Sequence, residues 1–372
     1  SMQNNTFICN KLHHIHLVDT LSKAKNLKFN VILAGVESHE LQEYISIIDH
    51  NKLLNHFVSI RLETNTKKVL KYDKREIKIF KEKLGQKKIK NTFFFVDTLV
   101  DNQFIIANIR SKNLVLIEEG IGFYSDDLYP LKEWLRQNFI KKPLYFIKYG
   151  FLFKANFIEQ GGLNYQNYLF CRFSKILPKN KIDNTVEIKN FDFKDYEIKK
   201  DFSYYSSKFK KIAFFVGSNT STFGEKIFNE EEILNEIFKI LRNFGYYILV
   251  KPHPIERKDK YKKFPVEIVT DSCVAEEMIQ SIKPNISLSL QSSALINIRN
   301  KNSIFLYKIT NIETGFTKGI DNVLSFFPNA HAPKNIDDFI GILNNISENE
   351  ISHNNQDMYL SSLINNFIEE QK

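Results

Sequence analysis

The sequence is poor in cysteine: it has three in 372 residues, and Cys9, Cys171 and Cys273 lie far apart. This spacing indicates neither a disulfide framework nor a zinc site, and it is typical of a protein kept reduced in the cytosol. The chain also lacks a run of about 20 apolar residues, so no membrane-spanning helix is predicted. Its start has no charged segment followed by an apolar one. We therefore expect a cytoplasmic protein, free or attached peripherally to the inner membrane.

Motifs for binding nucleoside triphosphates or nucleic acids are also missing. No glycine-rich loop ends in Lys-Ser or Lys-Thr, and Asp126-Asp127 is not the Asp-any-Asp arrangement that holds a metal on a nucleotide diphosphate. No zinc finger, RNP-type strand or basic zipper accompanies the formal net charge of +9. We expect no metal cofactor and no nucleic-acid partner. The positive charge is better explained by an anionic donor, an anionic acceptor or a lipid surface.

What the sequence does contain is a regular alternation of short apolar runs and amphipathic stretches. The runs NVILA at 30–34 and LVLI at 114–117 predict buried strands, as do KIAFFV at 211–216 and YYILV at 246–250. Apolar residues at helical spacing predict a long helix over 230–243. Short apolar strands separated by helices are typical of parallel β/α/β units.

The chain is therefore predicted to be an α/β protein with two Rossmann-like, doubly wound domains facing a cleft. Residues 1–175 form the N-terminal domain and 208–345 the C-terminal domain. The segment 176–207 is rich in Lys, Asp and Asn and is predicted to be a linker. Residues 346–372 include a helix over 358–370 that can pack back on the first domain. Such domains place ligands at the carboxyl ends of their strands. Two of them facing a cleft is the architecture of GT-B glycosyltransferases, and other two-domain α/β proteins give a similar pattern.

Two adjacent carboxylates follow the clearest strand of the first half. Glu118 and Glu119 stand at the carboxyl end of 114–117, and Gly120 and Gly122 come next. Adjacent acids repel each other, which raises one pKa toward the range of a general base. The glycines allow a ligand to approach the backbone closely. The alternative is a solvated loop with acids in turn positions.

A histidine between two prolines follows a strand of the second half. In Lys251-Pro252-His253-Pro254 the prolines restrict the backbone to extended conformations. Such a backbone suits an imidazole that faces a ligand. His253 can bond a leaving phosphate and, when protonated, offset developing negative charge. The alternative is a turn histidine without a role.

Two other loops of the second half offer hydroxyl groups after strands. Ser292 and Ser293 follow the predicted strand 286–290 and open a helix. Free N–H groups and serine hydroxyls at such a position can bind an anion, although simple helix capping is the commoner use. Gly217-Ser218-Asn219 follows 211–216 and can contact a phosphate or the acceptor.

A basic, aromatic stretch at 139–158 interleaves Lys141, Lys142, Lys148 and Lys154 with aromatic and aliphatic residues. It predicts one of two structures. Either it is a core helix whose outer face carries the lysines, or it is an amphipathic segment that lies in a membrane interface.

Three histidines, His13, His14 and His16, cluster after the predicted strand 6–9. Their spacing does not place all three on one face of a helix, so no metal site is predicted from them. If they follow the strand directly, they can line the acceptor side of the cleft.

The three main motifs occur in a fixed order: Glu118-Glu119-Gly120 in the first domain, then His253-Pro254 and Ser292-Ser293 in the second. This order resembles that of bacterial sialyltransferases, especially the lipooligosaccharide sialyltransferase family and the capsular polysialyltransferases. Those families carry an acid-acid-Gly motif, a His-Pro motif and a Ser/Thr pair. The resemblance implies a GT-B fold. It also implies an inverting, metal-independent transfer of a sialic acid, or a related nonulosonic acid, from a CMP donor to a hydroxyl of a bacterial capsule or lipooligosaccharide.

The resemblance also implies roles for individual residues. Glu118 is the preferred base for the acceptor hydroxyl, with Glu119 second, and His253 contacts the CMP phosphate and assists its departure. Ser292 and Ser293 bind the same phosphate. The first domain then holds the acceptor and the second the CMP-sugar. The remaining donor-binding residues expected are Gly120, Gly122, Lys251, Pro254, Gly217, Ser218 and Asn219.

Other functions stay open. A transferase of CDP-linked polyol phosphates would use similar His-Pro and Ser-rich phosphate contacts. Such an enzyme would need a second catalytic histidine in the first domain. The acid-acid-Gly element argues against a transferase of this kind. A CMP-Kdo transferase of capsule assembly is a further alternative. A non-catalytic glycan-binding protein would keep the fold without needing Glu118 and His253.

Overall fold

The computed structural model of the chain divides into two compact units. The first comprises Ser1–Asn190, Asp195–Glu197 and Met358–Lys372, and the second Phe191–Lys194 and Ile198–Asp357. Among the residues that the structure describes, no helix is long and apolar enough to span a bilayer. The described residues are 4–25, 28–50, 54–85, 88–125, 129–155, 161, 165–177, 185–187, 200–218, 229–271, 273–297, 301–346 and 360–371.

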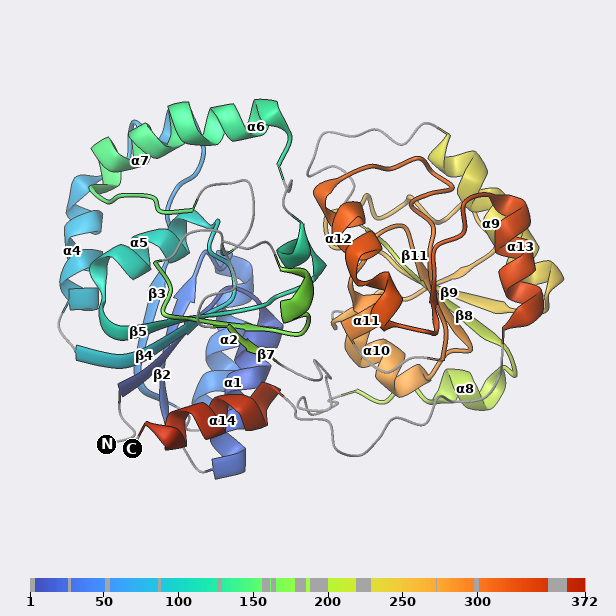
Figure 1. Cartoon of the computed structure of the whole chain (residues 1–372), viewed down its shortest axis with the longest axis horizontal. Helices are drawn as coiled ribbons and strands as arrows, with labels where there is room; N and C mark the ends of the chain where they lie inside the picture. The colour runs from blue at the N-terminus through green and yellow to red at the C-terminus, as the bar shows by residue number, and fades with distance from the viewer. Residues whose placement is uncertain are drawn as a thin grey trace. The chain divides into compact units, whose positions relative to one another are not determined.

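The first unit is built on a parallel sheet with seven strands in the described residues (Figure 1). Their order is β3-β2-β1-β4-β5-β6-β7. The chain moves outward from β1 to β3, returns beside β1 and then continues the other way, so the winding changes direction between β1 and β4. Open α/β sheets bind ligands at such a point. The strands are β1 (Asn5–Cys9), β2 (Phe29–Ala34), β3 (Leu54–Ile60), β4 (Lys88–Phe94), β5 (Arg110–Ile117), β6 (Tyr168–Cys171) and β7 (Thr185–Glu187).

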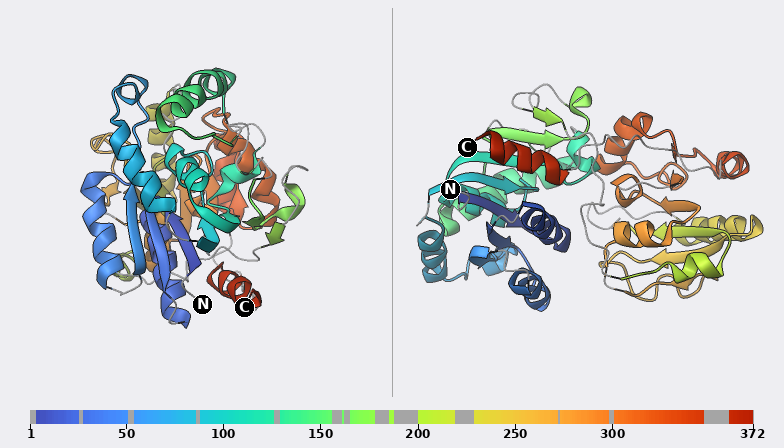
Figure 2. Two further views of the ribbon diagram at one scale, coloured as in Figure 1. Left: turned by 90° about the vertical axis from the view of Figure 1, so that its left-hand side faces the viewer. Right: turned by 90° about the horizontal axis from the view of Figure 1, so that it is seen from below.

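Right-handed connections between parallel strands place helices on both faces of this sheet. α1 contacts α2 and α14, whereas α4 contacts α5. Phe367 of α14 (red in Figure 2) packs against Phe93 of β4 and Phe170 of β6, with ring centroids 6.2 and 5.4 Å apart. The helices are α1 (Leu12–Lys25), α2 (Ser38–His50), α3 (Thr66–Val69), α4 (Lys74–Gly85), α5 (Val100–Asn108), α6 (Leu131–Arg136), α7 (Lys142–Tyr149) and α14 (Leu360–Glu370).

The second unit repeats this winding with a six-stranded parallel sheet in the described residues. Its order, β10-β9-β8-β11-β12-β13, changes direction between β8 and β11. The strands are β8 (Ile212–Val216), β9 (Tyr247–Lys251), β10 (Glu267–Ile268), β11 (Ile286–Ser289), β12 (Ser303–Phe305) and β13 (Ala330–His331). The helices are α8 (Tyr204–Lys208), α9 (Glu230–Asn243), α10 (Ala275–Ile282), α11 (Ala294–Asn297), α12 (Gly315–Val323) and α13 (Ile336–Asn345).

The apolar pattern explains why these elements form. All five residues of β8 are buried, as expected for a central strand covered on both faces. In α9 the buried residues recur at helical spacing, and the first turn carries Glu230, Glu231 and Glu232, whose charges favour a helix N-terminus. The prediction of two doubly wound α/β domains is confirmed.

Part of the segment predicted as a linker has regular structure. Within 176–207, β7 extends the first sheet by pairing with β6. α8 lies in the same segment and contacts α10 of the second unit. The polar composition of 176–207 therefore did not predict the two short elements β7 and α8.

Candidate active site

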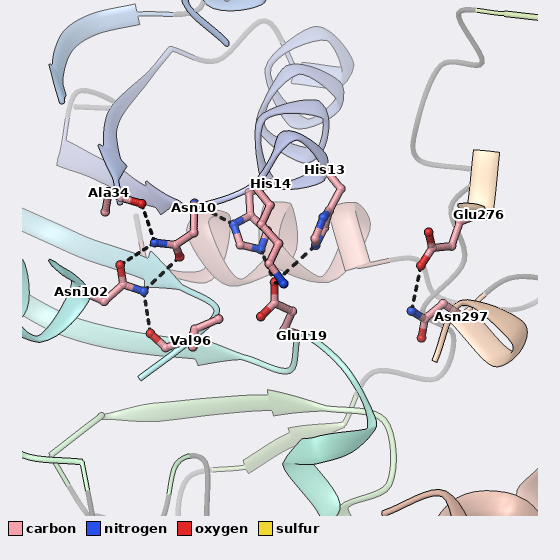
Figure 3. A network of polar contacts seen from close by, with 10 residues as sticks. Asn10, His13, His14, Ala34, Val96, Asn102, Glu119, Glu276 and Asn297 are labelled. Atoms are coloured by element: carbon pink, nitrogen blue, oxygen red, sulfur yellow. Dashed lines mark hydrogen bonds and ion pairs between the residues drawn. The ribbon is translucent and has the colours of Figure 1, made fainter. Parts of the chain in front are cut away.

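In the first unit, polar side chains from the segments that follow two strands meet around one carboxylate (Figure 3). Lys11, His13 and His14 follow β1, and Glu119 stands two residues past β5. Glu119 Oε1 lies 3.0 Å from Lys11 Nζ, 3.0 Å from His14 Nε2 and 3.7 Å from His13 Nε2. The carboxyl ends of parallel strands share one edge of a sheet, which brings together residues more than 100 positions apart.

His14 is held in one orientation and one tautomer. Its buried ring stacks on Phe95, with centroids 3.9 Å apart. The backbone N–H of Asn10 donates to Nδ1 at 3.0 Å, so in the neutral ring the proton is on Nε2, which faces Glu119. Burial lowers the pKa of His14, so the ring is neutral near pH 7. Asn10 is itself fixed by side-chain hydrogen bonds with Asn102.

The same surroundings keep Glu119 ionised. Burial opposes its charge, but Lys11 and the hydrogen bond from His14 lower the pKa of Glu119 well below its ordinary value. The side chain is 15% exposed. All its polar contacts are made by Oε1, and within the described part of the chain Oε2 has no donor. That oxygen can therefore accept a hydrogen bond from a bound hydroxyl.

Glu118, the neighbouring acid, lies in the interior instead. Its carboxylate accepts from Arg172 Nε at 2.9 Å and from the Arg172 backbone N–H at 2.9 Å, and the Tyr124 hydroxyl donates to it as well. The side chains of Glu118 and Arg172 are 1% and 4% exposed. Burial and the Glu118 charge raise the pKa of Tyr124 well above its ordinary value, so its hydroxyl stays protonated. Glu118 thus forms a buried ion pair that fixes β5 to the end of β6.

A metal could be held by one group of side chains among the described residues. Ligand atoms of His13, His14 and Glu119 all lie within 4.8 Å of one another, and imidazole and carboxylate are ligands for zinc. His16 is not in this group. The Lys11 ammonium contacts the same carboxylate oxygen at 3.0 Å and would repel a cation there. The expectation that no metal is needed stays a prediction.

In the second unit, loops after three neighbouring strands lie at one sheet edge, because β9, β8 and β11 are adjacent. The Gly217 N–H donates to the Lys251 carbonyl at 2.8 Å. The hydroxyls of Ser218 and Ser289 lie 2.8 Å apart, and Ser289 donates to the Val216 carbonyl at 2.8 Å. These bonds join the loops across the point where the winding changes direction.

His253 is fixed by backbone hydrogen bonds around its turn. Its Nδ1 accepts the Ile255 N–H at 3.2 Å, and its carbonyl accepts the Glu256 N–H at 2.9 Å. With Nδ1 as acceptor, Nε2 carries the proton and can donate to an anion. A Cβ on Gly217 would lie 2.5 Å from the His253 nitrogen and 2.1 Å from Glu256 Oε1, so this loop contact requires glycine.

The other predicted site residues differ in their surroundings. Ser292 Oγ accepts the Ala294 N–H at 3.3 Å, so it caps the start of α11, and Ser293 beside it is half-buried. Lys251 Nζ donates to the Asp271 carbonyl at 3.3 Å. Pro254 is exposed, and Gly120 is half-buried. Gly122 is buried within a 3₁₀ turn, Ile121–Tyr124. Asn219 and Asp126-Asp127 lie outside the described residues.

Sequence reasoning missed Lys11, Asn10 and Arg172. A signal for the first two was present, because Asn10 and Lys11 directly follow the buried strand β1, as the two acids follow β5. Arg172 follows β6, a strand of four residues that the apolar pattern did not mark.

Comparisons with known proteins bear on the family and the fold. Residues 5–305 match the family model described as alpha-2,8-polysialyltransferase (POLYST). No curated protein sequence matches significantly. Among solved structures, a UDP-GlcNAc 2-epimerase of Methanocaldococcus jannaschii is similar at a TM-score of 0.57 and 14% identity, covering 98% of this chain and 99% of that one. A spinosyn forosaminyltransferase is similar at a TM-score of 0.52 and 9% identity, covering 100% and 99%. The glycotransferase of kitacinnamycin gives 0.51 and 9%, covering 92% and 90%.

At these identities the structural likeness shows the fold alone. That fold is the GT-B fold, and the chain is a glycosyltransferase. More narrowly, it belongs to the alpha-2,8-polysialyltransferase family, since the family model covers most of its length. The fold class and the resemblance to bacterial sialyltransferases are thereby confirmed, and a non-catalytic glycan-binding role is set aside.

Proposed function

We propose that the chain transfers a sialic acid, or a related nonulosonic acid, from a CMP donor to a hydroxyl of a bacterial capsule or lipooligosaccharide, with inversion and without a metal. One observation carries the proposal. A carboxylate at the end of β5, Glu119, is held ionised by Lys11 and His14 while one of its oxygens has no donor within the described residues. In the second unit, His253 accepts a backbone N–H at Nδ1, which places the proton of the neutral ring on Nε2.

The acceptor step uses Glu119 Oε2. The acceptor hydroxyl donates to this oxygen, and its proton passes to the carboxylate as the new bond to the anomeric carbon forms. Because its pKa is low, Glu119 is ionised and is a weak base. It therefore takes the proton only as the attacking oxygen becomes more acidic during formation of the new bond. His14 does not take the proton, because its Nε2 proton faces Glu119 and its Nδ1 is occupied. It is a positioning residue.

The donor step separates the anomeric carbon from the phosphate oxygen of CMP, which departs with the bonding electrons. The Nε2–H of His253 can donate to the phosphate as this charge develops. Ser293 and Ser218 follow strands at the same sheet edge and can supply further donors. A monophosphate leaving group carries less charge than a diphosphate, which is consistent with a reaction that needs no metal.

The two adjacent acids receive different roles in this proposal. Sequence reasoning preferred Glu118 as the base, but its carboxylate is buried and bonded to Arg172 and Tyr124. A base must reach the proton that it abstracts. We therefore assign the base to Glu119 and a structural role to Glu118.

One observation favours a second candidate, transfer of a CDP-linked polyol phosphate. That reaction would want a catalytic histidine in the first domain, and His13 lies 3.7 Å from Glu119 with 19% of its side chain exposed. Burial and the neighbouring His14 lower the pKa of His13 well below its ordinary value, so its ring is neutral near pH 7.

A donor comparison in EDTA separates these reactions. Purified protein is incubated with a bacterial glycan acceptor and CMP-sialic acid, CMP-Kdo or CDP-glycerol, and nucleotide release is followed. We expect acceptor-stimulated CMP release from CMP-sialic acid alone. Release from CDP-glycerol, with none from CMP-sialic acid, would overturn the proposal in favour of polyol-phosphate transfer. Release from CMP-Kdo alone would show that the donor nucleotide is CMP, as proposed, but that the transferred sugar is Kdo.

A further inference from the structure

A second surface of the first unit has no part in the chemistry described above. α6 and α7 are joined by a π-helical turn, Gln137–Lys141, and α7 ends at Gly150 with a left-handed φ of 67°. In two views this helical segment runs along the side of the unit away from α14 (Figures 1 and 2).

The outward face of this segment is apolar. Leu131, Phe139, Ile140, Phe146 and Ile147 are 54–72% exposed. Leu131, Leu135 and Phe139 follow one another at steps of four residues. Phe139 and Phe146, like Ile140 and Ile147, are seven residues or about two turns apart, so these side chains lie along one side of the segment. Large apolar side chains that gather in one exposed patch mark an interaction site more often than single ones do.

The inward face is already satisfied by the first unit. Tyr145 and Tyr149 are buried, and the Tyr149 hydroxyl donates to the Glu63 carbonyl at 2.6 Å. Lys148 Nζ donates to the Leu70 carbonyl at 2.7 Å. The expectation of a core helix with lysines on its outer face is therefore wrong here, because Phe and Ile face outward. Residues 156–158 of the predicted stretch lie outside the described residues.

Positive charges flank the apolar stripe. The described segment 129–155 has six lysines and arginines and one acid, Glu133. Lys132 and Arg136 of α6 are exposed, and Arg136 lies 3.6 Å from Glu133. Lys141 and Lys142 are half-buried and carry their long stems along apolar neighbours.

We propose that this face, called the α6–α7 face and formed by Leu131, Leu135, Phe139, Ile140, Phe146 and Ile147 with Lys132 and Arg136, docks on a bilayer that contains anionic phospholipid. An amphipathic helix with apolar residues on one side and cations around them lies in the headgroup region, with its apolar side chains in the acyl boundary. The flanking cations meet the anionic headgroups. This surface brings the enzyme to a membrane and is independent of the transfer reaction.

Vesicle flotation tests the proposal. Wild type is mixed with vesicles of phosphatidylcholine alone or with one quarter phosphatidylglycerol. We expect binding to the anionic vesicles that weakens with salt, and at least about tenfold weaker partitioning of the double variant Phe139→Asp, Phe146→Asp. Phe326→Asp, which places the same charge at a 45% exposed phenylalanine of the second unit, is the matched control and should bind like wild type.

The alternatives give different results. Equal flotation of the double variant and the control would overturn the proposal, provided that both variants unfold at the wild-type temperature. A wild-type dimer in size-exclusion chromatography with light scattering that becomes monomeric in the double variant, without vesicle binding, would assign the face to a second copy. Unchanged CMP release from CMP-sialic acid, with a short soluble acceptor present, would show that the two aspartates leave the reaction intact.

Discussion

Glu118 and Glu119 are adjacent in the chain but lie in different environments. The first is paired with Arg172 in the interior, and the second is 15% exposed beside Lys11 and His14. Repulsion between neighbouring acids was expected to raise a pKa, yet the pKa of Glu119 is lowered, because Lys11 and the His14 hydrogen bond outweigh burial. At the residue scale, partners across the sheet edge decide the chemistry.

The buried ion pair predicts a stability effect for Glu118. Glu118→Gln leaves the Arg172 guanidinium buried without an anion, and we expect the free energy of unfolding to fall by about 3–5 kcal/mol. Urea denaturation measures it. The double variant Glu118→Ala, Arg172→Met removes both charges and should recover most of the loss. An unfolding midpoint unchanged in Glu118→Gln would contradict the structural role.

His253 offers a substitution that separates folding from phosphate contact. In His253→Asn the amide oxygen can replace Nδ1 as acceptor of the Ile255 N–H, but the Nε2 donor is lost. We expect kcat to fall about 10²- to 10³-fold while the unfolding temperature stays unchanged. Steady-state kinetics with varied donor checks this. Activity within about twofold of wild type would remove His253 from the donor step.

At the element scale, the loops after β8 and β9 depend on Gly217. An alanine Cβ would lie 2.5 Å from the His253 backbone nitrogen, a contact that the chain must relieve by moving. Gly217→Ala should therefore shift the turn that carries His253 and weaken CMP binding about tenfold or more. Gly245→Ala is no matched control, because Gly245 has a positive φ. Gly341→Ala is one, since nothing lies within 4 Å of its added Cβ. Calorimetric titration with CMP compares the two, and equal affinities would refute the prediction.

The sequence predicts buried strands better than polar or short elements. β8 is a continuous apolar run and β2 is interrupted only by Asn30, whereas β7 has three residues and β13 two. α4 was missed because Ile77 and Leu84 are its buried residues among many charged ones. α12 contains Gly315 and Gly319, which lower helix propensity, and a capping box between Thr314 and Thr317 sets its start.

The candidate site could be predicted in part. The motifs after β5, β9 and β11 are visible in the sequence because each follows an apolar run. The roles of Lys11 and His14 depend on strand order. In the sheet only β4 separates β1 from β5, although β2, β3 and β4 all lie between them in the chain. No local pattern reveals which of two adjacent acids turns inward, because Arg172 approaches from β6.

For the whole molecule, one buried and two half-buried histidines predict a loss of stability in acid. Burial lowers the pKa values of His13, His14 and His331 below the ordinary 6.5, so the unfolded chain binds protons that the native state excludes. Stability therefore falls as pH drops below about 6.5, by up to about 1.4 kcal/mol per pH unit for each histidine. Denaturation at pH 7.5 and 6.0 should show a smaller change in the double variant His13→Asn, His14→Asn. An equal change in stability in wild type and in the double variant would show that His13 and His14 do not cause the loss of stability in acid.

The central claim is that Glu119 is the base of a metal-independent transfer from a CMP-sugar. The direct measurement is CMP release from CMP-sialic acid in EDTA, with and without a glycan acceptor, for wild type, Glu119→Gln and Glu118→Gln. We predict acceptor-stimulated release by wild type and a loss of about 10²- to 10⁴-fold in Glu119→Gln, whose unfolding curve stays close to wild type. Folded Glu118→Gln should keep activity. A wild-type rate in Glu119→Gln, or a rate that EDTA abolishes and a divalent metal restores, would contradict the account.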